Sequence, residues 1–185
     1  MDLTEAIYTR RATRDFTGEP VAKRTLDDLV DAAIQAPSAI NAQPWHFTII
    51  RDLALLDRIS TKAKAHLRKQ VDLGAPSKAS LEHLAGPDFH IFHHAPALVL
   101  ISTKAGEWAV EDAALAAENL MLAACGQGLG TCWIGFAQTW LETDEGRQVV
   151  DLPRGYRPVA PIAVGHPSEP GPPVPRSPAN IRWID

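Results

Sequence analysis

Apolar residues recur at intervals of three or four in the first part of the chain, and this spacing predicts amphipathic helices. Each such segment also follows a residue whose side chain can cap the free N–H groups at a helix N-terminus. We expect three helices here: from the capping pair Asp2 and Glu5 to about Thr9, from the capping pair Thr25 and Asp28 to just before Pro37, and from Asp52 to about Val71.

Four other segments have the apolar, aromatic or β-branched character of strands. They are residues 45–51, 96–101, 130–136 and 157–164. The segment at 96–101, Pro-Ala-Leu-Val-Leu-Ile, contains no polar residue, so this strand should be buried on both faces of a sheet.

Further helices are expected between these strands. Residues 108–126 form the longest helical segment of the pattern, and its alanine-rich middle allows close approach to neighbours, which favours a central position. Another helix is expected at residues 139–150. Residues 73–94 have no regular period, and we expect an irregular excursion there with room for a short helix around residues 77–85. The presence of both helices and strands predicts an α+β fold.

The C-terminal segment carries six of the fifteen prolines between Pro167 and Pro178, yet it ends on Ile181, Trp183 and Ile184. One interpretation is a disordered proline-rich tail. However, burying the three apolar side chains would stabilise docking by several kcal/mol at about 1.5–3 kcal/mol each. A polyproline spacer of about fourteen residues spans on the order of 40 Å, enough to cross a partner subunit. We therefore expect a main domain at 1–166 and an arm at 167–185 that wraps a partner.

Composition and charge exclude several classes of protein. The chain has 185 residues, 45% hydrophobic and 22% charged, as in ordinary globular domains. A net charge of −4 argues against general binding of nucleic acid or anionic membranes. Apolar runs fall short of the roughly 20 residues of a membrane span, and the N-terminus lacks a signal-peptide pattern. Two cysteines, Cys125 and Cys132, make no disulfide framework, so we expect small core thiols in a cytoplasmic protein.

The first candidate binding segment contains three arginines, Arg10, Arg11 and Arg14, within five residues. Guanidinium groups bind phosphate through charge-assisted hydrogen bonds worth roughly 1.5–3 kcal/mol each. The alternative is a solvated basic turn that pairs with Asp15 and Glu19. The residues alone leave both interpretations open.

The second candidate is the loop Pro-Ser-Ala-Ile-Asn-Ala-Gln-Pro at 37–44, directly before a predicted strand. An amide side chain offers a donor and an acceptor together, as needed to recognise an imide, a nucleobase edge or a peptide. The alternative is simple loop capping by Ser38 and Asn41.

The third candidate is the segment around Trp133, which is flanked by Gly128, Gly130 and Gly135. Glycines let a backbone approach a flat ligand closely, although one of them can instead cap a helix. The order of glycines of a phosphate loop is absent. A fourth candidate is Arg176, the lone cation of the proline-rich segment, for which surface solubility is the alternative.

Three histidines, His90, His93 and His94, are the remaining cluster of potential ligands. They lie in the irregular segment, without an acidic partner at metal-site spacing. We therefore expect no metal site.

Together and in this order, these segments resemble the nitroreductase family of FMN-dependent oxidoreductases over nearly the whole chain. Members typically contain Arg-Arg-Ser-x-Arg-x-Phe and then Pro-Ser-x-x-Asn-x-Gln-Pro-Trp-x-Phe. The matching residues here are Arg10, Arg11, Arg14 and Phe16, with Ala12 in place of Ser, followed by Pro37, Ser38, Asn41, Gln43, Pro44, Trp45 and Phe47. Residues 118–130 and 161–167 look like the family's central helix with its exit and its last core strand.

The resemblance implies a nitroreductase-like fold, with a central mixed sheet flanked by helices, in an intertwined homodimer with FMN at its interface. The basic residues would hold the ribityl phosphate, the loop at 37–43 would contact FMN bound mainly by the other subunit, and backbone N–H groups at 133–135 would face the flavin N5. Ala12 loses a hydroxyl contact to the flavin, and Ile134 stands where some members have Glu. The expected cofactor-binding residues are Arg10, Arg11, Ala12, Arg14, Pro37, Ser38, Asn41, Gln43, Trp133, Ile134, Gly135 and Arg176.

The resemblance also implies an activity. NADH or NADPH would reduce FMN, and a nitroaromatic, a quinone or a related small acceptor would then be reduced at the same face in a ping-pong cycle. No obligatory acid or base side chain is expected, and residues 73–94 would shape substrate access. The alternatives are a specialised flavin enzyme of the same fold, such as a dehalogenase or a flavin-fragmenting enzyme, and a non-catalytic flavin-binding module.

Overall fold

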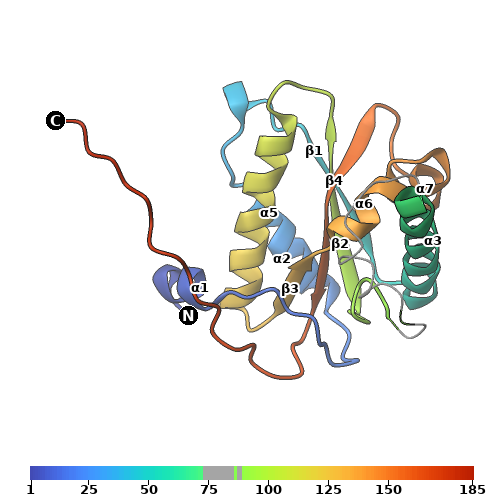
Figure 1. The fold of residues 1–185 in the computed structure, drawn as a ribbon, viewed down its shortest axis with the longest axis horizontal. Coiled ribbons are helices and arrows are strands. Elements are labelled where there is room, and N and C mark those ends of the chain that lie inside the picture. The colour runs from blue at the N-terminus through green and yellow to red at the C-terminus, as the bar shows by residue number, and fades with distance from the viewer. Residues whose placement is uncertain (73–85, 87–88) are drawn as a thin grey trace.

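The strands of the chain form one sheet, with helices packed on both of its faces (Figure 1). A computed structural model describes residues 1–72, 86 and 89–185. Within these residues the sheet has four strands in the order β1-β2-β4-β3. The elements are α1 (Leu3–Thr9), α2 (Lys23–Ala33), a 3-10 turn (Ala39–Asn41), β1 (Trp45–Ile50), α3 (Leu53–Asp72), β2 (Ala97–Lys104), α5 (Ala109–Gly126), β3 (Gly130–Trp133), α6 (Gly135–Leu141), α7 (Asp144–Val149) and β4 (Tyr156–Gly165).

The pairing of the strands differs from the expected mixed sheet. β1 with β2, β2 with β4, and β3 with β4 are all antiparallel. Among the described residues, the parallel component is an isolated bridge between Ala12 and Thr131. The reason is that the segment after α1 does not form a strand and touches β3 at one position only.

The central strand β2 is buried on both faces, as its apolar run predicts. Successive side chains of a strand point to opposite faces, so β2 contributes to two cores. Leu98 and Leu100 pack with α3 and α6, whereas Val99 and Ile101 pack with α2 and α5. This double burial fixes the sheet as the middle of three layers (Figure 1).

The alanine-rich helix α5 lies against the sheet, with Ala113, Ala116 and Ala117 fully buried. Small side chains let its backbone approach the strands closely, which confirms the predicted central position. It is not the longest helix, because α3 has 20 residues and α5 has 18 among the described elements.

Two of the three predicted caps are confirmed. Oδ1 of Asp2 accepts from the backbone N–H of Glu5 at 2.8 Å, and Oδ1 of Asp52 accepts from that of Leu55 at 3.1 Å. The predicted cap at Thr25 is wrong. The backbone is extended only as far as Ala22, so α2 already begins at Lys23 and Thr25 lies inside the helix. The short helix proposed for residues 77–85 lies outside the described residues.

The region after β3 also differs from expectation. The predicted strand at 130–136 ends at Trp133, because the backbone turns at Ile134 and α6 begins at Gly135. The predicted helix at 139–150 is divided into α6 and α7. The hydroxyl of Thr143 ends α6 by donating to the carbonyl of Trp140 and begins α7 by accepting from the N–H of Gly146.

The C-terminal segment leaves the body of the molecule beside α1 (Figure 1). It is held at its base by the bridge between Phe16 and Pro167 and by the hydrogen bond from the N–H of Ser168 to the carbonyl of Asp15. Beyond this point Trp183 is 81% exposed and Ile184 is 82% exposed. Among the helices that the structure describes, none is long and apolar enough to cross a membrane.

Candidate functional site

The arginine-containing segment lies beside β3, although the two are more than a hundred residues apart. The N–H of Thr13 donates to the carbonyl of Thr131 at 2.9 Å, and the N–H of Thr17 donates to the carbonyl of His166 at 2.8 Å. The approach is close at Gly130, where a Cβ atom would lie 2.7 Å from Cβ of Thr13. A glycine is therefore required at 130, and the first and third predicted segments meet there.

A cavity of about 590 Å³ lies on one side of this contact. This volume is in the range of small-molecule sites. Its walls are mostly aromatic and aliphatic, with one permanent cation, Arg14. The lining residues are Arg14, Phe89, Ile91, His93, Cys132, Trp133, Ile134, Gly135 and Phe136. We call this the ring cavity, because a flat aromatic ligand suits such walls.

Two titratable groups of the ring cavity are shifted toward their neutral forms. Burial and the nearby Arg14 lower the pKa of His93, so its imidazole is neutral at pH 7. Burial raises the pKa of the Cys132 thiol, although Arg14 opposes this effect. Cys132 is therefore a protonated thiol rather than a nucleophile, and Arg14 carries the charge of this cavity.

A second cavity, of about 470 Å³, lies on the other side of the contact. Its walls come from the end of α1, the loop before β3 and the base of the C-terminal segment. The lining residues are Met1, Thr9, Arg10, Arg11, Thr13, Cys125, Gly128, Leu129, Gly130, Thr131, Pro167, Pro170, Gly171 and Pro173. We call this the basic cavity.

The arginines of the basic cavity make contacts within the chain, but not all of their N–H groups have a hydrogen-bond partner. Nε of Arg10 lies 3.4 Å from Oε1 of Glu118, and Nη1 of Arg11 donates to the carbonyls of Tyr8 and Arg10. Nε of Arg11 is buried without a hydrogen-bond partner. Among the described residues, no ion pair joins these arginines to Asp15 or Glu19, as the solvated-turn interpretation would require. The site thus retains capacity for an anion.

The two cavities are neighbours, because consecutive residues of the same two segments line them. Thr13 and Arg14 point to different cavities, and so do Thr131 and Cys132. The structure therefore places Arg14 in the same cavity as the segment 133–135, and it places Arg10 and Arg11 in the neighbouring cavity. His93 and Phe89 also line the ring cavity. Sequence reasoning expected their irregular segment to shape substrate access, but it did not include either residue among the cofactor-binding residues, because no motif marks them.

The loop at 37–43 is a third, separate feature of the molecule. Its backbone is left-handed at three non-glycine residues, Ile40, Asn41 and Gln43, with φ of 49°, 56° and 45°. Nε2 of Gln43 donates to Oδ1 of Asn41, and the N–H of Gln43 donates to Oγ of Ser38. These bonds fix the amide pair on an exposed loop.

The loop does not lie near the cavities within one chain. The N–H of Ala39 donates to Asp112 in the first turn of α5, whereas the basic cavity lies at the last turn, where Cys125 lines it. The intervening helix spans roughly 20 Å at 1.5 Å per residue. Figure 1 shows the loop and the N-terminal segment at opposite ends of α5. The structure therefore does not bring Pro37, Ser38, Asn41 and Gln43 to the arginines of their own chain.

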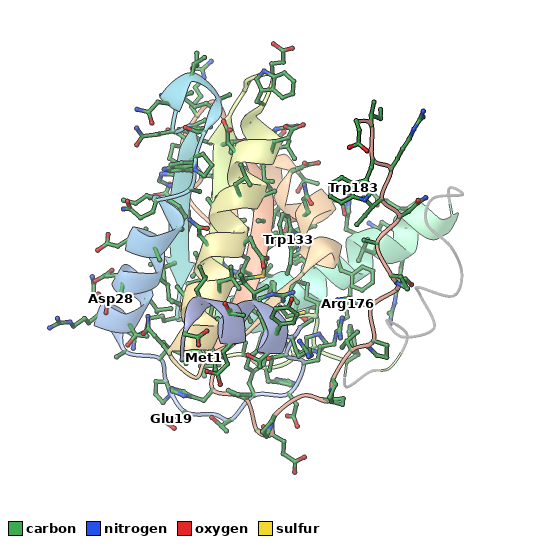
Figure 2. The ribbon with its side chains drawn as sticks, turned by 90° about the vertical axis from the view of Figure 1, so that its left-hand side faces the viewer. Met1, Glu19, Asp28, Trp133, Arg176 and Trp183 are labelled. Carbon is green, nitrogen blue, oxygen red and sulfur yellow. The ribbon has the colours of Figure 1, made fainter. Side chains whose placement is uncertain are left out.

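Apolar side chains are exposed near both ends of α5. Ile40, at the tip of the loop, is 99% exposed, and Trp108 and Leu115 are half-exposed. On α1, Leu3, Ile7 and Tyr8 are exposed. Arg176 lies on the exposed C-terminal segment beyond the residues that line the basic cavity (Figure 2).

Comparison with known proteins adds to this geometry. The sequence profile described as "Nitroreductase family" matches residues 7–166. A Methanothermobacter thermautotrophicus protein, named as a candidate NADH dehydrogenase/NAD(P)H nitroreductase, is 28% identical over 179 residues, covering 91% of this chain and 79% of that protein.

Solved structures have the same fold. A nitroreductase with bound FMN from Bacteroides fragilis superposes with a TM-score of 0.85 at 24% identity, and both chains are covered completely. An iodotyrosine deiodinase bound to FMN and 3-iodo-L-tyrosine superposes with a TM-score of 0.81 at 26% identity, again over both complete chains.

Proposed function

Because this chain belongs to the nitroreductase family, an FMN- and NAD(P)H-dependent family of oxidoreductases, we propose that it reduces small nitroaromatic, quinone or related acceptors by a ping-pong cycle. We propose further that it works as a homodimer that holds FMN where two subunits meet. The single observation that carries the proposal is the pair of neighbouring cavities, one basic and one aromatic, on either side of the contact between Thr13 and Gly130.

The two cavities fit the two ends of FMN. Arg10 and Arg11 provide guanidinium groups for the phosphate, and the buried, unpartnered Nε of Arg11 supports a missing acceptor there. The flat ring system suits the walls formed by Trp133 and Phe136. Bound there, the flavin supplies hydride acceptance and donation, which no side chain of the site can supply.

Arg14 has a different role from Arg10. It lines the ring cavity, where burial and then the positive charge of Arg14 lower the pKa of His93. A fixed cation beside a flavin ring favours the reduced, more negative form and so raises the reduction potential. Arg14 would therefore tune the cofactor, whereas Arg10 and Arg11 would anchor it. Ala12 is bridged to Thr131 and would serve through its backbone.

The position of the loop at 37–43 supports the proposed homodimer. A binding site that needs both the loop and the arginines cannot be completed by one chain, because α5 separates them by roughly 20 Å. A second copy could place its loop over the first copy's cavities. The exposed apolar residues Ile40, Trp108 and Leu115 are then the surface that association would bury.

The C-terminal segment supports the same assembly. It begins as a wall of the basic cavity, and the side chains of its apolar end are exposed. We propose that residues 167–185 wrap the partner subunit and that Arg176 approaches an FMN phosphate on the way. Figure 2 shows Arg176 and Trp183 along this exposed segment.

A reductive dehalogenase is the second candidate function. It is favoured by the 26% identity to iodotyrosine deiodinase over the complete chain. Comparing a nitroaromatic, a quinone and a halogenated phenol as oxidants of the reduced protein separates the two candidates. Reoxidation by the halogenated phenol alone would favour the dehalogenase.

The division of labour between the cavities is tested by comparing FMN with riboflavin, which lacks the phosphate. Arg10→Ala should weaken the binding of FMN by about 1.5–3 kcal/mol, roughly 10- to 150-fold in the dissociation constant, and leave the affinity for riboflavin unchanged. Arg14→Ala should weaken both ligands alike. Arg24→Ala, on the exposed face of α2, is the matched control. Wild-type FMN affinity in both cavity variants would overturn the proposal.

A further inference from the structure

A cluster of histidines and one carboxylate lies on α3 and the turn after residue 89, outside both cavities. It consists of Asp57 from α3 and of His90 and His94 from the turn. One ligand atom from each residue lies within 4.8 Å of the other two. The sequence spacing hides this cluster, because Asp57 precedes His90 by more than thirty positions.

The contact between Asp57 and His90 has an unusual geometry. Nε2 of His90 lies 3.1 Å from Oδ1 of Asp57, yet among the described residues this buried nitrogen has no partner at the angle of a hydrogen bond. The His90 side chain is only 9% exposed. A buried ring nitrogen without a partner is costly, so this atom calls for an explanation.

A bound cation would give this ring nitrogen a partner. In tetrahedral coordination, nitrogen and oxygen ligands about 2.0–2.2 Å from Zn²⁺ lie roughly 3.3–3.6 Å from each other. On binding, the 3.1 Å contact would therefore lengthen slightly, and the cluster, whose ligand atoms now lie within 4.8 Å of one another, would contract. The ring nitrogen then points at the metal and not at the carboxylate oxygen. We propose that Asp57, His90 and His94 form a binding site for Zn²⁺ or a similar first-row divalent cation.

The surroundings suit such a site in most respects. Imidazole nitrogen and carboxylate oxygen are the ligand types that Zn²⁺ takes. The donors open onto a cleft of about 430 Å³, so water can complete the coordination. Lys64 lies on the same cleft, and its charge opposes a cation.

The competing arrangement is an ordinary His–Asp hydrogen bond. Nδ1 of His90 faces the N–H groups of Phe92 and His94 at 3.2 and 3.4 Å. If Nδ1 accepts from both, Nε2 carries the proton and can turn to donate to Asp57. If a metal binds Nε2, Nδ1 carries the proton and cannot accept hydrogen bonds. The N–H groups of Phe92 and His94 must then move away from Nδ1, so the turn must rearrange on metal binding.

This rearrangement would connect the metal site to the ring cavity. The turn at 91–94 carries His93, which lines the ring cavity, and both His93 and His94 have left-handed backbones with φ of 53° and 55°. Non-glycine residues in this conformation store strain. A cation held by His90 and His94 would therefore fix the orientation of His93 on the opposite side of the same turn.

The experiment titrates Zn²⁺ into the untagged, metal-stripped full chain by calorimetry. We expect one Zn²⁺ per chain, and at least about 10-fold weaker binding in Asp57→Asn and in His94→Gln. Both of these side chains are exposed, so the variants should fold. His46→Gln, on β1, is the control and should bind as the wild type does.

A second readout separates a metal ligand from a merely structural residue. Zn²⁺ should raise the melting temperature of the wild type and of His46→Gln, but not that of Asp57→Asn. The site is refuted if the wild type binds no stoichiometric Zn²⁺, or if Asp57→Asn and His94→Gln bind it as tightly as the wild type. Asp57 and His90 would then form only a hydrogen bond.

Discussion

Asp112 holds the loop at 37–43 in place: the backbone N–H of Ala39 in this loop donates to Oδ1 of Asp112 at 2.9 Å. Asp112 is buried, with 4% of its surface exposed, and lies in the first turn of α5. One carboxylate thus satisfies a loop N–H and complements the positive end of the helix dipole. This contact sets the position of the loop that we propose to reach into the partner's site.

Replacing Asp112 should therefore loosen the loop. Asp112→Ala leaves the N–H of Ala39 without a partner, which should lower the free energy of unfolding by about 1–3 kcal/mol in urea. Glu111→Ala is the matched control, because Glu111 is an exposed carboxylate in the same helical turn. Equal losses in the two variants would mean that the helix dipole, and not the hydrogen bond, is responsible.

The amide of Asn41 should be needed for flavin binding. Asn41→Ala removes the amide that we propose to face the partner's flavin, and it also strains a backbone with φ of 56°. Asn41→Gly removes the same amide but relieves the strain. Both variants should bind FMN more weakly, as measured by fluorescence titration. If only Asn41→Ala loses affinity, the effect is backbone strain and Asn41 is a capping residue.

The C-terminal segment should link assembly to cofactor content. Deleting residues 168–185 should shift the dimer toward monomer or aggregate and lower the FMN content at the same time, as measured by light scattering and absorbance. Arg176→Ala should lower FMN affinity without changing the mass. A truncated protein that remains a dimer with full FMN content would show that the segment has neither role.

The same segment contains an internal control. Trp183→Ala removes a side chain that is 81% exposed in the single chain, so it should not destabilise an isolated subunit. We expect it to weaken the dimer, because the docked side chain would bury apolar surface worth about 1.5–3 kcal/mol. An unchanged dissociation constant would locate the docking energy elsewhere.

Acid should destabilise the protein partly through His93. Burial and Arg14 lower its pKa below the ordinary value of about 6.5. The unfolded chain then binds more protons between the lowered pKa and about 6.5, so stability is complete above this range and falls as the pH decreases through it. His93→Gln should show a smaller loss of unfolding free energy between about pH 7.5 and about pH 5.5. An identical loss in both proteins would contradict the assigned shift.

Much of the fold could be predicted because local chemistry determines it. The caps at Asp2 and Asp52 and the buried strand β2 follow directly from sequence pattern. The predicted cap at Thr25 and the predicted strand end at Phe136 were wrong, because several start and end positions of a short helix or strand satisfy the same local pattern. Tertiary contacts decide which of these positions the chain adopts.

The candidate site was predictable only in part. The arginines and the segment around Trp133 carry recognisable motifs, and the structure places Arg14 in one cavity with Trp133 and places Arg10 and Arg11 in the neighbouring cavity. His93 lines the same cavity without any motif, and Asp57 meets His90 from a distant helix. Such meetings depend on packing between layers, which sequence spacing does not encode.

The measurement that tests the central claim most directly is the anaerobic absorption spectrum of the purified protein during titration with NADH and then with NADPH. We predict a yellow protein whose flavin absorbance bleaches with at least one of the two and returns when a nitroaromatic or quinone is added, with FMN released on denaturation. A colourless protein that FMN cannot reconstitute would contradict the account, and so would a flavin spectrum that neither nicotinamide changes.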